Sequence, residues 1–231
     1  MSISNPSQTG SEYPAPVALL GGTFDPIHRG HTQPALQLAD LFGWSSVHLQ
    51  PTFAPPHRSV PAVSDAHRWN MVKLACEDDP RLVADDFELS QQQPTRTVHT
   101  LAHLQHRHPN ASLCFIMGMD SFINFTSWLD WPGILERAHL FVLPRPGYSA
   151  SQIPSRLRQF IVPACETTPA IFSRGAGKVY VADTHPINIS ATELRAMLAS
   201  TLSSSAPATN PYPTLLAPQV YAYIRRHNLY R

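Results

Sequence analysis

Residues 17–31 read VALLGGTFDPIHRGH, and this stretch decides the fold that the sequence predicts. Val17 to Leu20 is a short apolar run that ends in Gly21-Gly22, which is typical of a buried strand running into a tight turn. From His31 to Phe42 apolar side chains recur with helical spacing, Pro34 is tolerable in a first turn, and Gly43 can end the helix. The stretch therefore predicts a strand, a loop and a helix in that order.

The same alternation of strand and helix continues along the chain. Extended segments are predicted at Val47–Gln50, Arg81–Leu89, Leu113–Met117 and Leu140–Leu143, and helices at Asp65–Cys76, Thr97–His106, Trp131–Ala138 and Ala217–His227. We expect the poorly periodic Ser149–Gly177 and the Ser/Pro-rich Ser200–Pro213 to be loop-like connections. Such alternation predicts an α/β fold with a mostly parallel sheet, helices on both faces, and ligands outside the carboxyl ends of the strands.

Length and composition are those of an ordinary enzyme-sized domain. The chain has 231 residues, 43% of them hydrophobic, and we expect residues 16–231 to form a single domain behind a disordered tail at 1–15. Seventeen basic and sixteen acidic residues give a net charge of +1, so no general field favours nucleic acid or membrane as a partner.

Cysteine usage and hydropathy predict a cytoplasmic protein. Cys76, Cys114 and Cys165 are widely spaced and odd in number, which indicates neither a disulfide framework nor a zinc ligand set, so no metal held by the protein is expected. No apolar run approaches the roughly 20 residues that span a bilayer, and the amino-terminal stretch lacks an apolar signal core.

Two histidines, His28 and His31, stand three residues apart where the first helix begins. A glycine after a strand, here Gly22, lets backbone N–H groups approach a polyphosphate, and the helix N-terminus adds donors and a positive dipole end. Histidine side chains can then stabilise charge that builds on a phosphoryl group. The alternative is that the pair binds a metal or caps the helix, but no third ligand is nearby in the sequence.

A second polar segment, residues 189–195, reads ISATELR. Ser190 and Glu193 have the spacing of a capping box, which predicts a helix start with free backbone N–H groups. Arg195, about one turn in, and the hydroxyl of Thr192 can add donors to a bound phosphate. An ordinary capped surface helix is the alternative reading.

These two segments carry a resemblance to a known superfamily. Gly22 to His31 resembles the G-[ST]-F-D-P-x-H-x-G-H signature of the nucleotidyltransferases, and residues 189–195 resemble their I-S-[AST]-T-x-x-R signature, in the expected order. The resemblance implies a Rossmann-like fold with a small C-terminal helical part, and it makes His28, His31 and Arg195 the catalytic residues. The ATP site that it implies comprises Gly22, Thr23, Phe24, His28, His31, Gly118, Asp120, Ile189, Ser190, Thr192 and Arg195.

Further segments resemble the nicotinate-nucleotide adenylyltransferase branch of that superfamily. They are Pro55-Pro56-His57-Arg58, Thr95–Thr100, Gly118-Met119-Asp120-Ser121, the surroundings of Trp128, and the turn at Arg145. The resemblance implies that the acceptor substrate is bound by His57, Arg58, Thr97, Trp128 and Arg145. The open alternatives are a solvated loop for His57 and Arg58, a helix cap for Asp120, a core position for Trp128, and an ordinary surface position for Arg145.

The branch resemblance implies a specific reaction. The adenylyl group of ATP, accompanied by Mg²⁺, would pass to nicotinate mononucleotide, giving nicotinate adenine dinucleotide and pyrophosphate in NAD biosynthesis. Arg96 stands where the branch commonly has an aromatic residue, and Thr52 and Phe53 stand where asparagine is expected. The alternatives therefore stay open: nicotinamide mononucleotide or phosphopantetheine as acceptor, a cytidylyltransferase, or a non-catalytic nucleotide-binding module. The sequence predicts no oligomeric state.

Overall fold

The computed structural model describes residues 14–53, 60–183, 189–202 and 211–231, and in them six parallel strands form one sheet. The strands are β1 (Val17–Gly22), β2 (Ser46–Pro51), β3 (Leu82–Ala84), β4 (Leu113–Gly118), β5 (Ala138–Leu143) and β6 (Val179–Val181). Their order across the sheet is β3-β2-β1-β4-β5-β6, and every neighbouring pair is parallel. The predicted α/β fold is confirmed, with a sheet that is wholly parallel in the described residues.

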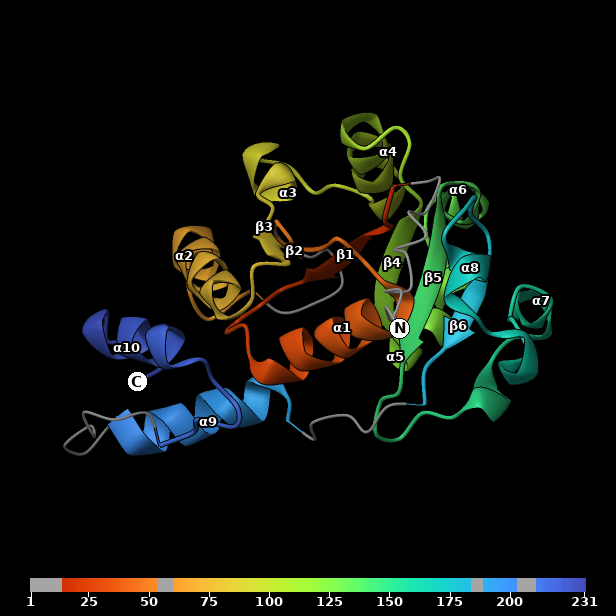
Figure 1. The fold of residues 1–231 in the computed structure, drawn as a ribbon. Coiled ribbons are helices and arrows are strands. Elements are labelled where there is room, and N and C mark those ends of the chain that lie inside the picture. Colours follow the sequence, from red (N-terminus) through yellow and green to blue (C-terminus); the bar gives the residue numbers. More distant parts are fainter. Residues whose placement is uncertain (1–13, 54–59, 184–188, 203–210) are drawn as a thin grey trace, which may run out of the picture.

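Helices connect the strands and extend the chain after the last one (Figure 1). The longer helices are α1 (Arg29–Phe42), α2 (Asp65–Ala75), α4 (Thr97–Arg107), α9 (Ala191–Leu202) and α10 (Pro218–Arg226). The shorter ones are α3 (Phe87–Ser90), α5 (Met119–Ile123), α6 (Trp131–Arg137), α7 (Ser155–Arg158) and α8 (Pro169–Phe172). None of the described helices is long and apolar enough to cross a membrane.

The first helix starts two residues earlier than the sequence predicts. His28 is its N-cap and His31 lies in its first turn, so Pro34 falls in the second turn rather than the first. Pro34 cannot donate there, but the remaining helix is unbroken and its apolar positions are buried. The predicted end at Gly43 is confirmed, because this residue has a φ of 66°, in the left-handed region that glycine adopts at little cost.

Three other segments differ from the prediction. Only Leu82–Ala84 of the predicted extended stretch Arg81–Leu89 is a strand, because the Asp85 carboxylate accepts from the Phe87 N–H (3.1 Å) and turns the chain into α3. The predicted loop Ser149–Gly177 holds α7, α8 and two short 3₁₀ helices, and residues 200–202 of the other predicted loop end α9. The strand β6 was not predicted at all.

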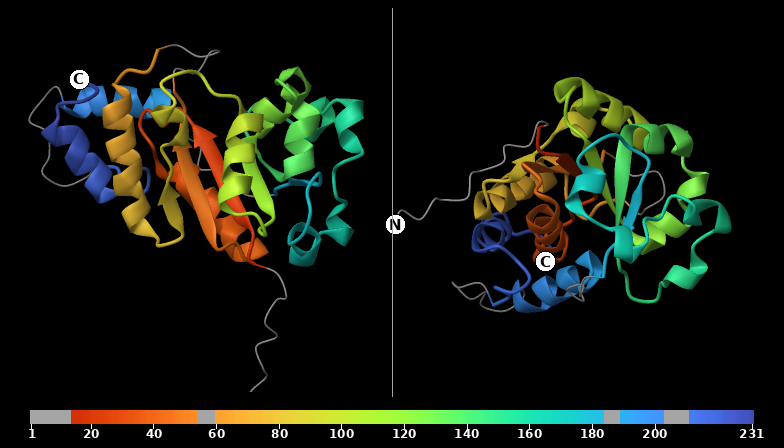
Figure 2. Two further views of the ribbon diagram at one scale, coloured as in Figure 1. Left: turned by 90° about the horizontal axis from the view of Figure 1, so that it is seen from above. Right: turned by 45° about the vertical axis from the view of Figure 1, so that its right-hand side comes forward.

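Alternating side chains of the strands build a core on each face of the sheet. One face packs Ala18 and Leu20 of β1 against α1, α2, α8, α9 and α10, and the other packs Val17 and Leu19 against α4, α5, α6 and α7. Figure 2 shows these two layers of helices around the sheet. The prediction of helices on both faces is thereby confirmed.

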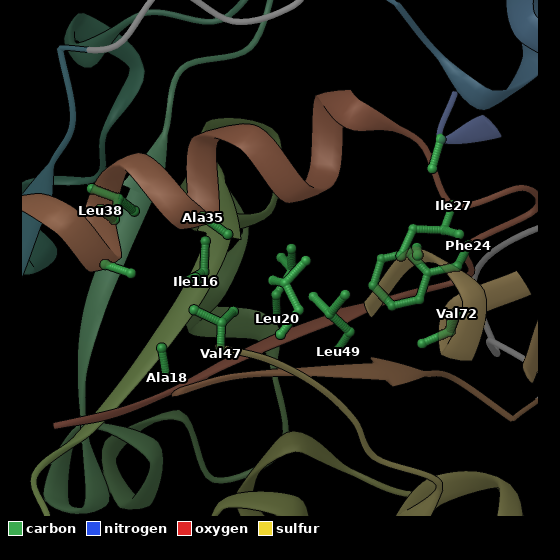
Figure 3. Packing of buried hydrophobic residues seen from close by; sticks show 14 of the residues in the cluster. Ala18, Leu20, Phe24, Ile27, Ala35, Leu38, Val47, Leu49, Val72 and Ile116 are labelled. Atoms are coloured by element: carbon green, nitrogen blue, oxygen red, sulfur yellow. The ribbon is translucent and has the colours of Figure 1, made fainter. Parts of the chain in front are cut away.

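Helix α1 lies against the centre of the sheet. Figure 3 shows Ala35 and Leu38 on the side of α1 that faces Ile116 of β4, with Leu20 and Val47 beside them. All five are nearly or completely buried. Burying a leucine or isoleucine side chain contributes about 1.5–3 kcal/mol, so this layer fixes where α1, and with it the two histidines, begins.

Candidate active site

A cavity of about 640 Å³ opens at the carboxyl ends of β1 and β4. The chain leaves β1 toward β2 on one side of the sheet and reaches β4 on the other, so the strand order reverses between these two strands. In open parallel sheets ligands bind at such a reversal, because the loops that follow the two strands diverge and leave a crevice. The cavity is therefore where the fold leads one to expect a ligand.

The cavity brings together residues from both ends of the chain. Its lining includes most of the residues that the sequence predicted for an ATP site, namely Gly22, Thr23, Phe24, His28, His31, Gly118, Asp120, Ile189, Ser190, Thr192 and Arg195. Two residues predicted to bind the acceptor, Trp128 and Arg145, also line it. The parts that these residues play in binding and catalysis stay predictions.

The loop after β1 is shaped by close contacts. An added Cβ on Gly22 would lie 2.8 Å from the Phe24 ring, so no larger residue fits without displacing that ring. Phe24 itself has a φ of 49° and is buried, and its ring meets the His31 ring edge to face at 5.1 Å. The glycine thus lets Phe24 turn inward and support one of the two histidines.

The two histidines stack on each other, with ring centroids 3.8 Å apart. The His28 backbone N–H donates to Nδ1 of His31 (3.3 Å), so a neutral His31 carries its proton on Nε2. The Nδ1 atom of His28 is buried without a hydrogen-bond partner among the described residues. An added Cβ on Gly30 would lie 2.9 Å from that atom, which explains why a glycine stands between the histidines.

His28 is held in its neutral form. Burial lowers its pKa from 6.5 to about 4, and the positive charge of Arg145 lowers it further in the same direction. A neutral imidazole can donate one hydrogen bond to an anionic ligand without itself carrying a charge. An anion placed in the cavity would oppose both effects, because it would stabilise the charged ring.

The start of α9 forms the facing wall of the cavity. The Ser190 hydroxyl accepts from the Glu193 N–H (3.1 Å), and the Glu193 carboxylate accepts from the Ser190 N–H (2.8 Å), so the predicted capping box is present. Arg195 donates to the Asp25 carbonyl (2.8 Å) and to the Thr192 hydroxyl (3.2 Å). This wall places a helix N-terminus and one guanidinium at the cavity.

Asp120 and Arg145 meet over Gly118 at the end of β4. The Arg145 Nε atom lies 3.7 Å from the Asp120 carboxylate, and it would lie 2.8 Å from a Cβ added to Gly118. Asp120 stands in the first turn of α5 but makes no capping hydrogen bond in the described structure, so the helix-cap reading is wrong. Its Oδ1 atom is buried and unpartnered, free to accept from a ligand hydroxyl.

The residues predicted for the acceptor are placed unequally. Trp128 lines the cavity and also packs edge to face on Phe115 and Phe125, so the binding and core readings both describe it. Thr97 begins α4 outside the cavity lining, and the Arg96 side chain is exposed. Residues 54–59, and with them His57 and Arg58, lie outside the described residues, although residues 60–62 line the cavity.

Sequence reasoning missed several residues that shape the site. Asp25 lies in the first signature but was given no part, and Ser121 and Tyr148 line the cavity beside residues that were predicted. Arg68, fully buried, donates to the carbonyls of Thr23 (2.6 Å) and Thr52 (2.7 Å) and so ties the loops after β1 and β2 together. A buried arginine on an amphipathic helix carries no local signal of such a contact.

Comparisons with known proteins agree with this geometry. Residues 19–197 match the family model described as cytidylyltransferase-like. A protein of Aeromonas hydrophila, named "Probable nicotinate-nucleotide adenylyltransferase", is 41% identical over 218 residues, which cover 94% of this chain and 97% of the relative. A protein of the same name from Salmonella gallinarum is 40% identical over 216 residues, covering 93% and 98%.

Solved structures share the fold. The structure described as Plasmodium falciparum nicotinic acid mononucleotide adenylyltransferase complexed with NaAD has a TM-score of 0.67 to this chain, at 18% identity, over 94% of this chain and 98% of that one. At this identity the likeness concerns the fold alone. The family follows from the sequence relatives and the family model: the chain belongs to the nicotinate-nucleotide adenylyltransferases of the cytidylyltransferase-like family.

Proposed function

We propose that this protein transfers the adenylyl group of ATP to nicotinate mononucleotide, giving nicotinate adenine dinucleotide and pyrophosphate in NAD biosynthesis. The observation that carries the proposal is the meeting of both signature segments in one cavity at the reversal of the strand order. The relatives of about 40% identity bear the name of this activity over nearly their whole length.

The reaction needs positioning and charge stabilisation rather than a protein nucleophile. A 5′-phosphate oxygen of the mononucleotide attacks the α-phosphorus of ATP in line and forms the new P–O bond. The bond from the α-phosphorus to the bridging oxygen breaks, and pyrophosphate leaves with that electron pair. His28 and His31 donate to the phosphate oxygens on which charge builds, and Arg195 binds the β- or γ-phosphate.

The remaining cavity residues would hold the two nucleosides. Asp120 accepts from a ribose hydroxyl, Arg145 lies near the adenine, and Trp128 offers a ring face to the pyridine. His57 and Arg58, which follow β2 in sequence, hold the acceptor phosphate in this proposal. Thr97 would have to act from outside the cavity lining, and for this residue the geometry offers no support.

Mg²⁺ enters the proposal with ATP. The described residues contain no group of three or more His, Cys, Asp or Glu side chains that could hold a metal ion. Asp25 and Glu193 are bonded to protein donors, which leaves Asp120 as a cavity carboxylate for either a ribose hydroxyl or the ion. Such a site suits Mg²⁺, which is commonly bound by one or two carboxylates plus substrate phosphates, and the ion supplies charge that neutralises the triphosphate.

The test is pyrophosphate release by the purified protein with ATP and Mg²⁺. Nicotinate mononucleotide, nicotinamide mononucleotide and phosphopantetheine are compared as acceptors, and CTP is compared with ATP. We expect release with ATP and nicotinate mononucleotide only. A preference for the amide or for phosphopantetheine would change the acceptor, a preference for CTP would make the protein a cytidylyltransferase, and no release in any mixture would favour a non-catalytic nucleotide-binding module.

A His28→Ala variant tests the part played by the first histidine. Loss of one well-placed donor to developing charge lowers the rate by about 10²–10³, so we expect kcat to fall by this much while the far-ultraviolet circular dichroism is unchanged. Near-normal turnover would remove His28 from the mechanism. The free cysteines Cys76, Cys114 and Cys165 agree with a reducing compartment, and a cytoplasmic location is part of this proposal.

A further inference from the structure

The C-terminus of the chain ends at the candidate active site. Helix α10 stops at Arg226, and the next five residues bring the last residues close to α9 (Figure 1). Leu229 is buried in the core, which anchors this segment. Asn228 and Tyr230 both have positive φ angles, 52° and 61°, a conformation that costs a non-glycine residue roughly 1 kcal/mol. The packing of these last residues therefore outweighs a measurable backbone penalty.

The Tyr230 hydroxyl reaches a buried carboxylate of the phosphate-binding loop. It donates to Oδ1 of Asp25 at 2.7 Å, across 205 positions of sequence. The Ala62 N–H donates to the other oxygen, Oδ2, also at 2.7 Å. Only 6% of the Asp25 side chain is exposed, so each of these bonds replaces water that the carboxylate has lost. The two bonds together fix the orientation of the carboxylate plane.

The same aspartate holds Arg195 without neutralising it closely. Arg195 donates to the Asp25 backbone carbonyl at 2.8 Å, whereas its distance to Oδ2 is 3.8 Å, too long for a hydrogen bond. Burial and the Asp25 charge raise the pKa of Tyr230, so its hydroxyl stays protonated and remains a donor. The guanidinium is therefore anchored at one nitrogen, and its charge stays available in the cavity wall.

We propose that Tyr230 is a positioning residue for adenylyl transfer: its hydroxyl holds the Asp25 carboxylate, and this keeps Arg195 directed at the triphosphate of ATP. If the hydroxyl is removed, Oδ1 of Asp25 is left buried without a donor, and Arg195 is the nearest cation that can satisfy it. Arg195 would then close on Asp25 and compete with its own ligand. The inference rests on the proposed function for the identity of that ligand.

The test compares Tyr230→Phe with Tyr223→Phe. Tyr223 is a matched control, because its hydroxyl bonds to His67 (3.0 Å) and Asn70 (3.0 Å) of α2 and does not line the cavity. Loss of a hydrogen bond to a charged group corresponds to about a tenfold change in affinity. We expect Tyr230→Phe to raise KM for ATP about tenfold, with kcat and KM for the acceptor changed less than threefold, and Tyr223→Phe to leave all three within twofold.

An Asp25→Asn background shows whether the effect passes through Asp25. In this background Tyr230→Phe should change KM for ATP less than twofold, because the competing charge is gone. A tenfold rise there as well would overturn the route through Asp25. An unchanged KM for ATP in Tyr230→Phe alone, or a fall in melting temperature with equal losses for both substrates, would overturn the positioning role.

Binding of a non-hydrolysable ATP analogue, measured by calorimetry, separates this inference from the proposed function. If the wild type binds the analogue but forms no dinucleotide, the proposed function is wrong, while a tenfold weaker Kd in Tyr230→Phe would still support the positioning of Arg195. If the wild type is active and the Kd of Tyr230→Phe equals that of the wild type, the inference is wrong and the function stands.

Discussion

His28 couples the cavity to the stability of the fold through its proton. Its pKa is about 4 in the folded protein and 6.5 without the fold, so between these values the unfolded chain binds a proton that the native state does not. Stability is therefore fully present above about pH 6.5 and is lost as the pH falls toward 4. The neutral ring that the site uses as a donor is a liability in acid.

We predict that a His28→Gln variant has a flatter pH dependence of stability than the wild type. Between pH 7 and pH 4.5 the wild type should lose about 2 kcal/mol of unfolding free energy more than the variant, from the size of the pKa shift. Urea unfolding at both pH values measures this difference. The exposed His106, replaced in the same way, is the control, and an equal slope in wild type and His28→Gln would contradict the prediction.

Glu88 is a second buried titratable residue, far from the reaction. Burial raises its pKa from 4.5 to about 7, partly offset by the Thr100 hydroxyl that donates to it at 2.9 Å, and the nearby Asp85 charge raises it further. Because the folded pKa lies above the unfolded one, stability from this group is present below about pH 4.5 and is lost as the pH rises through 7.

We predict that Glu88→Gln stabilises the protein at pH 8 relative to pH 5. The amide keeps an acceptor for Thr100 but never ionises, so its advantage over the wild type should grow by roughly 2 kcal/mol between these pH values. Chemical denaturation at both values provides the measurement. The exposed Glu136, changed to Gln, should show no such trend, and a constant difference for Glu88→Gln would refute the assignment.

Which residues could be predicted depended on how far apart their partners lie in sequence. His28, His31, Ser190 and Arg195 stand in short motifs whose spacing carries their chemistry, and all four line the cavity. Asp25 could not be interpreted in the same way, because its carboxylate is defined by Ala62 and Tyr230, which lie 37 and 205 positions away. Local pattern contains no information about such contacts.

Among the elements, the N-terminus of α9 serves both the fold and the site. Its cap is the Ser190 hydroxyl, and the same residue lines the cavity. Helix α2 offers a comparison, because Ser64 accepts from the His67 N–H (3.4 Å) in the same capping geometry, away from the cavity lining. The two serines differ in position rather than in chemistry.

We predict that Ser190→Ala and Ser64→Ala lower stability alike but affect ATP differently. Each loses one N-cap, which costs about 1 kcal/mol. Only Ser190→Ala also loosens a helix N-terminus and removes a hydroxyl at the cavity, so its Kd for ATP should rise about threefold to tenfold. Thermal unfolding and titration calorimetry give the two numbers, and weaker ATP binding in both variants would show that stability alone is responsible.

The elements that sequence predicts well are long and periodic. The strands β1, β2, β4 and β5 and the helices α1, α2, α4 and α10 were all expected close to their observed bounds. The missed strand β6 has three residues, and α7 and α8 have four each, which is too short for periodicity to register. Each of these is held by tertiary packing, as the buried Leu157 and Phe172 show.

For the whole molecule, one core joins the sheet to the C-terminal helices that complete the site. Leu194 and Leu198 of α9 and Ile224 of α10 are fully buried in the same cluster as Leu20 of β1 and Leu38 of α1. Half of the candidate phosphate site thus stands on the sheet and half on helices that share its core. We infer from this continuity that residues 16–231 unfold as one domain.

We predict that Leu198→Ala lowers the melting temperature but leaves a single transition. A buried leucine replaced by alanine costs 2–5 kcal/mol, about, and if α9 belongs to the common core this loss destabilises the sheet as well as the helix. Differential scanning calorimetry should then give one peak with equal calorimetric and van't Hoff enthalpies. The exposed Leu129, replaced by alanine, should shift the peak little, because 58% of this side chain is already in water. Two separated peaks in Leu198→Ala would mean that the C-terminal helices form their own unit, and the site would then be completed by docking of two units rather than by folding of one.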